Sequence, residues 1–252
     1  NPTIVNSSNI GSGFSTPYFW DISNDRDLTF TPKIYFNNNP LALAEYRQDY
    51  ENSYLIIDTG FTKGYKKTTN KKLPGNKNHL FAKFVSDLSK DSDSISSNVE
   101  FNIQHVSNES YVRVYDLETS LVSKNMNILE NSLQYDYFTN DTFFGANIAA
   151  YENTKIVDNK KYEYFAPYLT FDKNISNSEN FGSLDLSSNL RVRNYDVNKQ
   201  TEFLVNDLNW KSIKSLSNFG FETQFKGLLK GVNYDAKNTK NYKNDNFNSE
   251  LS

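Results

Sequence analysis

The sequence contains no cysteine and only two histidines. The absence of cysteine excludes disulfide bonds and thiolate metal ligands from these 252 residues and leaves the redox compartment undetermined. His79 and His105 fall in different predicted strands without an HExxH type of spacing, so we expect ordinary strand positions rather than metal ligands. The sequence therefore predicts neither a metal site nor a cofactor.

Excess positive charge and long hydrophobic runs are also missing. The 27 Lys and Arg residues stand against 30 Asp and Glu residues, and a net charge of −3 argues against nucleic acid as a partner. No stretch approaches the ~20 apolar residues of a membrane-spanning helix, and the opening residues lack the basic and apolar regions of a signal peptide. We expect no helical membrane span, and we expect this chain to be part of a longer protein.

Aromatic side chains, by contrast, are abundant, with 19 Phe and 17 Tyr spread among polar residues. In residues 27–36, apolar and polar side chains alternate with the two-residue period of a β-strand, and the period recurs at 98–106, 130–138 and 183–195. Further strands are predicted over 40–48, 52–60, 77–87, 141–152, 160–172, 201–211 and 219–232, with turns at 37–40, 139–141 and 174–180. Helical signals are nearly absent. The sequence predicts an all-β fold, an antiparallel meander of about a dozen long strands.

Two architectures fit this alternation. In a soluble sandwich the apolar faces pack against each other, and strands typically have ~5–6 residues. In a transmembrane barrel the apolar face meets lipid, strands have ~9–11 residues and aromatic side chains gather at the interfaces. The predicted lengths, and aromatic groups near strand ends such as 18–20 and 162–165, favour part of a large transmembrane β-barrel. A soluble β core stays open as the alternative.

Residues that could carry covalent chemistry are few. Asp91 and Asp93 lie in a Ser-rich loop and Asp25 precedes Asp27 in a turn, where solvated carboxylates are expected. There is no Gly-rich phosphate loop and no nucleophile elbow, so we do not expect an enzyme. The basic run at 63–72 could meet the phosphates of lipid A or core sugars, although a solvated loop is favoured.

The stretches PYFWDI (17–22), DLTFTP (27–32) and AEYR (44–47) resemble the opening of the barrel in the LptD (Imp/OstA) family, the lipopolysaccharide-assembly proteins of Gram-negative outer membranes. This block is the most specific part of the resemblance, and Trp20 belongs to it. The similarity runs in order through most of the chain.

A second block, FNIQHVSNESYVRVYD (101–116), resembles the family's strand followed by a Val-Ser-Asp…Tyr signature. Ser107 and Tyr111 match the signature, and Asn108 stands where Asp is usual. DLNWKS (207–212) is a weaker match. The resemblance also has departures, because the cysteines that many members use to tie their domains together, and the terminal aromatic residue of outer-membrane barrels, do not occur here.

The resemblance implies an outer-membrane translocon subunit that inserts lipopolysaccharide into the outer leaflet through a lateral barrel opening. Residues 1–12 would be a linker from a periplasmic jelly-roll domain, and 13–252 the N-terminal portion of the barrel. The implied partners are lipopolysaccharide, membrane lipid, the lipoprotein LptE as plug, and the periplasmic Lpt bridge proteins. The alternatives are a general outer-membrane pore and a soluble β-rich carbohydrate-binding module.

The resemblance and the strand period together nominate specific residues. Pro17 and Pro32 match the spacing of the family's paired gate prolines, and each removes one ladder donor, so we expect them to loosen a lateral gate. Residues 13–22 would then be the first barrel strand, paired with 25–36 and with the last strand of the intact protein. We expect Asp27, Glu45 and Arg47 to face the lumen, because a charge facing lipid at mid-membrane costs about 2–4 kcal/mol, and their neighbours Ala42, Ala44 and Tyr46 to face lipid.

Overall fold

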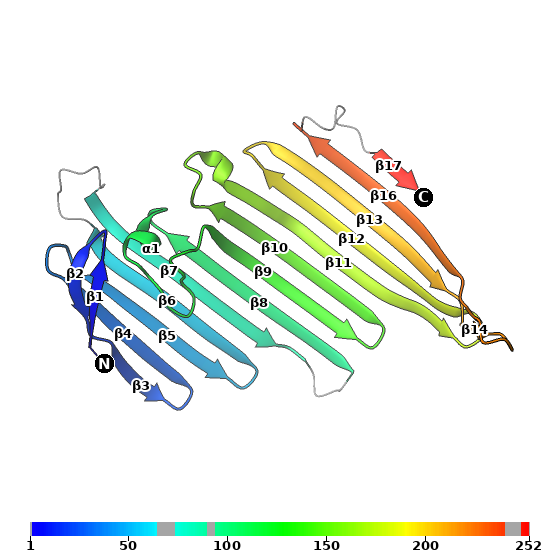
Figure 1. Cartoon of the computed structure of the whole chain (residues 1–252), viewed down its shortest axis with the longest axis horizontal. Helices are drawn as coiled ribbons and strands as arrows, with labels where there is room; N and C mark the ends of the chain where they lie inside the picture. Colours follow the sequence, from blue (N-terminus) through cyan, green and yellow to red (C-terminus); the bar gives the residue numbers. More distant parts are fainter. Residues whose placement is uncertain (1, 65–73, 90–93, 240–247, 252) are drawn as a thin grey trace. The chain divides into compact units, whose positions relative to one another are not determined.

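The computed structural model describes residues 2–64, 74–89, 94–239 and 248–251, and strands dominate it (Figure 1). The two helical segments are short, α1 (Tyr111–Val114) and the 3₁₀ turn η1 (Asn159–Lys161). The strands are β1 (Thr3–Ser7), β2 (Gly11–Ser15), β3 (Tyr18–Ser23), β4 (Arg26–Tyr35), β5 (Leu41–Tyr50), β6 (Ser53–Gly64), β7 (Pro74–Asp87), β8 (Ile95–Val106), β9 (Ile128–Thr139), β10 (Thr142–Asn153), β11 (Tyr162–Ser178), β12 (Gly182–Tyr195), β13 (Lys199–Lys211), β14 (Ser215–Leu216), β15 (Glu222–Thr223), β16 (Lys226–Lys237) and β17 (Asn248–Leu251).

The sheet is a meander, as the alternation predicts. Its strand order is β1-β2-β4-β5-β6-β7-β8-β9-β10-β11-β12-β13-β16-β17, with β3 also paired to β4. Antiparallel pairing of chain neighbours needs only short turns, which the Asn, Asp and Ser clusters provide. The all-β, antiparallel class is therefore confirmed. Within the described ranges, no helix is long and apolar enough to cross a membrane.

Two expected boundaries differ from the structure. The strand expected at 219–232 is interrupted at its start: Gly220 adopts φ +83° in a turn where its N–H donates to the Ser217 carbonyl, Glu222–Thr223 form the short β15, and β16 begins at Lys226. The Asn-rich cluster at 174–180 was expected to be a turn, but β11 continues through an irregularity to Ser178. Pairing with β12 thus outweighs the local turn preference of Asn and Ser.

Residues 1–12, expected to be a linker, contain β1 and the beginning of β2. The two strands form a hairpin, and β2 continues the sheet by pairing with β4. Gly13 permits this close pairing, because a Cβ there would lie 2.2 Å from the Ile34 carbonyl oxygen. Ile10, in the hairpin turn, is buried in the core. Residues 13–22 were expected to be the first strand of the sheet. In the structure β1 pairs with β2, and so lies beside the first part of that segment.

The described contacts divide the chain into two units. Unit 1 comprises residues 1–86, 100–132 and 151–161, and unit 2 comprises 87–99, 133–150 and 162–252. The apolar core of buried residues lies in unit 1, where residues 107–127, which we call the strap, cover one face of the sheet near β5, β6 and β7 (Figure 1). That core contains Ile10, Tyr35, Leu41, Leu43, Phe81, Tyr111, Val112, Tyr115, Leu117, Val122 and Leu129.

The two faces of β4 to β7 differ in character, as the two-residue period predicts. We call the face under the strap the strap face; it carries Asp27, Thr29, Thr31, Lys33, Tyr35, Leu41, Leu43, Glu45, Arg47, Ile56, Asp58, Gly60, Thr62, Lys77, His79, Phe81 and Lys83. We call the other the open face; it carries Arg26, Leu28, Phe30, Pro32, Ile34, Ala42, Ala44, Tyr46, Gln48, Tyr50, Ser53, Leu55, Ile57, Thr59, Phe61, Asn78, Leu80, Ala82, Phe84 and Ser86. The middle of the open face is mostly apolar and its polar residues lie toward the strand ends, whereas the strap face is mixed and charged.

Unit 2 shows the same division on β11, β12, β13 and β16. On one face Leu186 pairs with Leu208, which pairs in turn with Leu229. On the other face Lys230 donates to Asp207 at 3.0 Å. The alternation of apolar and polar residues predicted for 183–195 is therefore confirmed in its register.

Candidate functional site

Pro17 and Pro32 meet across one strand pair. Pro17 lies between β2 and β3, which both pair with β4, and Pro32 lies within β4. The last β2 pair is Ser15 with Lys33 and the first β3 pair is Tyr18 with Phe30. At the break, the Thr16 N–H donates to the Pro32 carbonyl at 3.2 Å. The structure thus brings the two prolines to the same break in the ladder, where neither can donate a backbone hydrogen bond.

Beyond the break, β3 is an edge. Its partner is β4, and no other strand of the described chain pairs with it. Tyr18, Phe19 and Trp20 are 66%, 57% and 55% exposed, so the aromatic residues that carry the family resemblance contribute little burial here. An edge strand with unpaired backbone groups and large exposed rings is a surface that normally requires a covering partner.

The three charged residues expected to face a lumen lie together on the strap face. The Arg47 guanidinium donates through Nε and Nη2 to the two carboxylate oxygens of Asp27, each at 3.0 Å. Its Nε also lies 3.9 Å from Glu45. Arg47 and Asp27 are opposite each other across β4 and β5, so strand register holds this bidentate pair. Whether this face lines a lumen stays a prediction.

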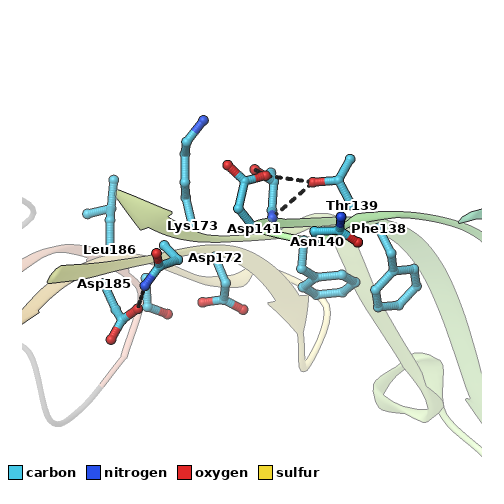
Figure 2. Close-up of a pocket in the computed structure, with 12 residues that line it drawn as sticks. Phe138, Thr139, Asn140, Asp141, Asp172, Lys173, Asp185 and Leu186 are labelled. Atoms are coloured by element: carbon cyan, nitrogen blue, oxygen red, sulfur yellow. Dashed lines mark hydrogen bonds between the residues drawn. The ribbon is translucent and has the colours of Figure 1, made fainter. Parts of the chain in front are cut away.

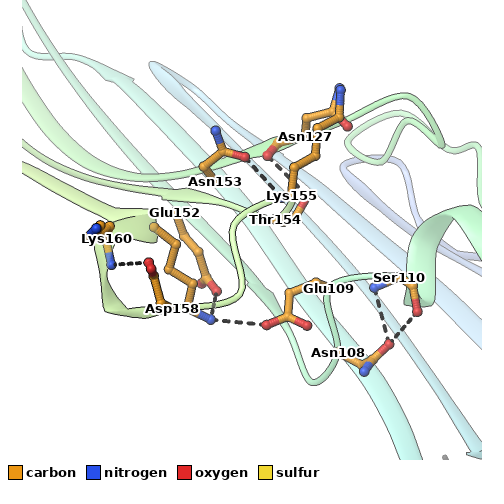
Figure 3. A network of polar contacts seen from close by, with 11 residues as sticks. Asn108, Glu109, Ser110, Asn127, Glu152, Asn153, Thr154, Lys155, Asp158 and Lys160 are labelled. Atoms are coloured by element: carbon orange, nitrogen blue, oxygen red, sulfur yellow. Dashed lines mark hydrogen bonds and ion pairs between the residues drawn. The ribbon is translucent and has the colours of Figure 1, made fainter. Parts of the chain in front are cut away.

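The resemblance-derived signature at Ser107 and Asn108 forms the start of the strap. The Ser107 N–H donates to the Asn78 carbonyl at 2.9 Å, and the Asn78 N–H donates to Ser107 Oγ at 2.8 Å. Asn108 Oδ1 accepts from the N–H and the hydroxyl of Ser110 at 3.2 and 2.8 Å (Figure 3). An Asp carboxylate would accept the same two bonds, so Asn at this position preserves the turn.

Tyr111, the third signature residue, is fully buried against a pair of polar side chains from the sheet. His79 Nε2 lies 2.7 Å from Asp58 Oδ1, and His79 Nδ1 lies 3.3 Å from the Tyr111 hydroxyl. Since a carboxylate only accepts, Nε2 carries a proton; in the neutral ring Nδ1 then accepts from the Tyr111 hydroxyl. Burial raises the pKa of Tyr111 far above its ordinary value, and the negative charges of the nearby Tyr115 and Asp58 groups raise it further. The phenol is therefore held as a neutral donor.

The pairing of His79 with Asp58 was not found from the sequence, which indicated an ordinary strand position for His79. His79 does belong to a strand, but it is 2% exposed and Asp58 is 1% exposed. The one feature of the sequence that could have indicated this pairing is the alternation of side chains, which places Asp58, Gly60 and Thr62 on one face of β6. His105, by contrast, is exposed in β8.

Ion pairs tie the strap region to the turn after β10. The Lys161 ammonium lies 2.7 Å from Glu152 and 3.3 Å from Glu109, and Thr154 Oγ1 donates to the Asn127 carbonyl at 3.1 Å (Figure 3). Lys161 is only 15% exposed at its side chain, so these contacts are partly shielded from water. Both ends of the strap are consequently attached to the sheet.

Unit 2 contains a shallow hollow of about 320 Å³ beside the β9–β10 turn, lined by Phe138, Phe143 and Leu186 together with polar side chains (Figure 2). Asp141, at this turn, accepts from the hydroxyls of Thr139 and Thr142, which hold its pKa below the ordinary value. Asp185 accepts from Asn174 at 2.6 Å. These contacts close the turn and the strand ends, and they offer no nucleophile with an adjacent base.

The remaining sequence candidates do not form a site. Asp25 accepts from the Ser23 hydroxyl within the β3–β4 turn. Asp91, Asp93 and most of the basic run, residues 65–72, lie outside the described residues. Within the described ranges, no group of three or more His, Asp or Glu side chains could hold a metal ion directly.

No protein-family model matches this chain, and no curated protein matches it.

Proposed function

We propose that this chain forms part of an outer-membrane β-barrel that delivers lipopolysaccharide to the outer leaflet through a lateral opening, as its resemblance to the LptD family implies. The observation that carries the proposal is the meeting of Pro17 and Pro32 at the break between β2 and β3. Two strands that must separate and pair again do so more easily when few backbone hydrogen bonds join them. Each proline removes one backbone donor, and a backbone hydrogen bond contributes a net ~0.5–1.5 kcal/mol.

The open face of unit 1 supports the membrane part of the proposal. Phe30, Phe61 and Leu80 are 42%, 48% and 43% exposed in three strands of the same sheet. Exposed apolar area costs roughly 25 cal/mol per Å² in water, and a lipid-facing barrel wall is one arrangement that removes this cost. Asp27 and Arg47 lie on the opposite face, where an aqueous lumen would solvate them.

The partners follow from the same proposal. Lipopolysaccharide is the cargo, membrane lipid covers the open face, the lipoprotein LptE plugs the barrel, and the periplasmic Lpt bridge proteins deliver the cargo. The chain itself supplies a wall and a gate, with no covalent step. A general outer-membrane pore would share the two faces of the sheet but has no use for a proline-weakened ladder.

The test replaces both prolines in the full-length protein, as Pro17→Ala with Pro32→Ala. We expect lipopolysaccharide to reach the cell surface more slowly and exclusion of large antibiotics to weaken, because the restored N–H groups can strengthen the ladder at the break. The matched control is Pro40→Ala, which lies before β5 and outside the break. Barrel assembly is checked by heat-modifiable migration on a mildly denaturing gel. Normal delivery by the double variant, at native levels of assembled barrel, would contradict the gate.

A further inference from the structure

Two shallow hollows of unit 2 share Phe143 as a lining residue. The first, of about 320 Å³, is the hollow beside the β9–β10 turn, and the second has about 160 Å³. The residues that line the second are Gln134, Asp136, Phe143, Gly145, Ala146, Asn147, Tyr168 and Thr170. We call the two hollows together the aromatic trough.

The aromatic trough lies on the polar face of unit 2. Asp172 pairs with Ser187, which pairs in turn with Asp207, on the face opposite the leucines of β12 and β13. Figure 2 shows the Phe138 ring on the same side of the sheet as the carboxylates of Asp172 and Asp185. Aromatic rings therefore stand here among hydrogen-bonding groups and away from the apolar face.

The rings of the trough are exposed although they contact one another. Phe138 and Tyr168 are 43% and 41% exposed, and the ring centroids of Phe138 and Phe143 lie 4.7 Å apart. Large apolar rings that remain exposed beside polar groups are typical of ligand sites, where a few oriented polar groups accompany aromatic side chains. A ligand that covers the rings would remove their contact with water.

Gly145 provides the space in which the Phe143 ring lies. A Cβ at Gly145 would stand 3.0 Å from Phe143 Cζ and 3.2 Å from Asp136 Oδ1, which is tighter than ordinary contacts. Because the glycine has no side chain, the ring can lie over the strand beside the Asp136 carboxylate. The trough therefore presents a flat aromatic surface next to a hydrogen-bond acceptor.

Side-chain hydrogen bonds hold the polar groups of the trough in place. Gln134 Nε2 donates to Asp136 Oδ2 at 2.6 Å, and Asn174 Nδ2 donates to Asp185 Oδ1 at 2.6 Å. A carboxylate has about four acceptor positions, so one such bond leaves it able to accept others. The trough consequently offers oriented acceptors beside its rings.

The charges of the trough favour an uncharged ligand over an anion. Four carboxylates and one lysine are the charged side chains among its described lining residues. Figure 2 shows that lysine, Lys173, extending away from the side that carries Asp172 and Asp185. A phosphate group would meet carboxylates there and be repelled, whereas a purely apolar ligand would desolvate them without a partner.

An uncharged sugar satisfies both requirements. Its C–H groups form an apolar face whose slightly positive hydrogens suit the negative face of an aromatic ring. Its hydroxyl groups donate hydrogen bonds, and those accepted by a carboxylate are the stronger kind.

We propose that the aromatic trough binds an uncharged oligosaccharide of hexose units. One hexose lies on Phe138 and Phe143 in the larger hollow, and the next lies between Phe143 and Tyr168 in the smaller one. Sugar hydroxyls donate to Asp172 and Asp136. The trough is shallow, so we expect a dissociation constant on the order of 1 mM. This inference does not depend on lipopolysaccharide transport.

The test is titration of the purified protein with maltotriose, β-1,4-galactotriose and β-1,4-mannotriose, in a detergent without a sugar head group. Binding is measured by saturation transfer from the protein to the sugar in NMR spectra. We expect saturable binding of at least one of the three sugars. Trigalacturonic acid, an anionic counterpart of galactotriose, should bind more weakly than the best of the three because carboxylates line the trough.

Substitutions locate the binding. Phe143→Ala should weaken it by about fivefold or more, and Asp172→Ala by about tenfold. Gly145→Ala keeps every ring and carboxylate but displaces Phe143, so it should weaken binding as well. The matched control is Phe171→Ala, because Phe171 is also half-buried but pairs with Ser188 on the leucine face.

A denaturant midpoint for each variant separates loss of binding from loss of fold. If Phe143→Ala does not fold, Phe138→Ala takes its place, since that ring is more exposed. Absence of saturable binding to all three neutral sugars would overturn the proposal. Binding that is unchanged in both Phe143→Ala and Asp172→Ala would overturn it too, because the sugar would then bind elsewhere. Tighter binding of trigalacturonic acid than of every neutral sugar would contradict the uncharged class.

Discussion

Gly60 has no side chain, and the ring of His79 occupies the space where one would lie. A Cβ at Gly60 would stand 2.6 Å from His79 Cε1 and 2.7 Å from Leu43 Cδ2, both shorter than real contacts. Gly60 and His79 are directly opposite in β6 and β7. Because Gly60 has no side chain, the imidazole of His79 can occupy this space and contact Asp58 through Nε2 and Tyr111 through Nδ1.

We expect Gly60→Ala to destabilise unit 1 by about 1–3 kcal/mol, the usual cost of forcing an extra group into packed surroundings. The measurement is the denaturant midpoint of the purified protein, with trypsin cleavage at Lys124 as a local reading of the strap. Gly227→Ala is the control, because a Cβ there would meet its nearest atom, in Trp210, at an ordinary 3.6 Å. Equal effects of the two substitutions would contradict the packing argument.

Removal of the Tyr111 hydroxyl tests the hydrogen bond to His79. Tyr111→Phe keeps the buried ring but leaves His79 Nδ1 without its partner, and we expect a loss of about 1–3 kcal/mol in the free energy of unfolding. Tyr50→Phe, at a 48% exposed position, should change stability by less than about 0.5 kcal/mol. Denaturant unfolding followed by tryptophan fluorescence provides the comparison. An unchanged free energy of unfolding in Tyr111→Phe would mean that the hydroxyl contributes nothing to the docking of the strap.

Tyr111 also predicts a dependence on alkaline pH. Its pKa is raised in the folded state, chiefly by burial, whereas an unfolded tyrosine titrates near its ordinary value of about 10. The group contributes equally to stability at every pH below about 9, and its contribution is lost as pH rises past about 10, because only the unfolded phenol then ionises. We expect the midpoint of unfolding to fall more steeply above pH 10 in the parent than in Tyr111→Phe. Parallel curves would contradict the assignment.

At the scale of elements, strand β5 separates two environments. Leu41, Leu43 and Glu45 face the strap, and the Ser120 hydroxyl of the strap donates to Glu45. Ala42 and Ala44 face the other way, opposite Phe61 and Thr59 of β6. A shift of register by one residue would place Glu45 and Arg47 on the apolar face, so the ion pair with Asp27 and the strap contacts oppose slippage.

Single cysteines in β5 of the full-length protein test which environment each face meets. We expect a cysteine at Ala44 to be quenched by a lipid-phase quencher after labelling, and one at Arg47 to react with a membrane-impermeant reagent. The physical reason is that a charge facing lipid at mid-membrane costs about 2–4 kcal/mol. Strong lipid-phase quenching at Glu45 or Arg47 would overturn the orientation.

The element scale also separates what the sequence could predict from what it could not. The period of two predicted the faces of β4, β5 and β12, because it depends only on the backbone of a strand. β1 was missed because it has only five residues and is followed by Gly11 and Gly13, which have no side chains and so show no alternation of apolar and polar residues. The docking of the strap on the sheet was missed for another reason. The strap joins Tyr111 to a histidine 32 positions earlier, and such contacts leave no local periodic signal.

At the scale of the whole molecule, the apolar side chains of the open face require an apolar environment. Apolar rows run from β3 across to β7, for example Trp20, Leu28, Tyr46, Ile57 and Ala82 in register. The antiparallel class followed from the sequence because several long strands alternate and short turn clusters separate them. Membership of a closed barrel did not follow, because alternation is common to walls that face lipid and walls that face another sheet.

We expect Leu80→Arg to reduce the amount of assembled protein in the outer membrane sharply, since an arginine on a lipid-facing wall costs about 2–4 kcal/mol near the bilayer midplane. Asn102→Arg is the control, because Asn102 already donates to Glu100 and an arginine there keeps a carboxylate partner. The measurement is the fraction of heat-modifiable protein in outer-membrane preparations. Tolerance of Leu80→Arg with native assembly would indicate that this face meets water.

The strap contacts also set an order of events in time. Ser7 Oγ donates to the Val114 carbonyl across a sequence separation of 107 residues, and Ile10 packs in the same core as Tyr111. Neighbouring strands can pair as soon as each turn is made, whereas closing so long a loop is entropically slow. The β1–β2 hairpin and the proline break involve only residues 3–35 and can form early, whereas we expect the docking of Ser7 and Ile10 against the strap to come late, after residues up to the strap are in place.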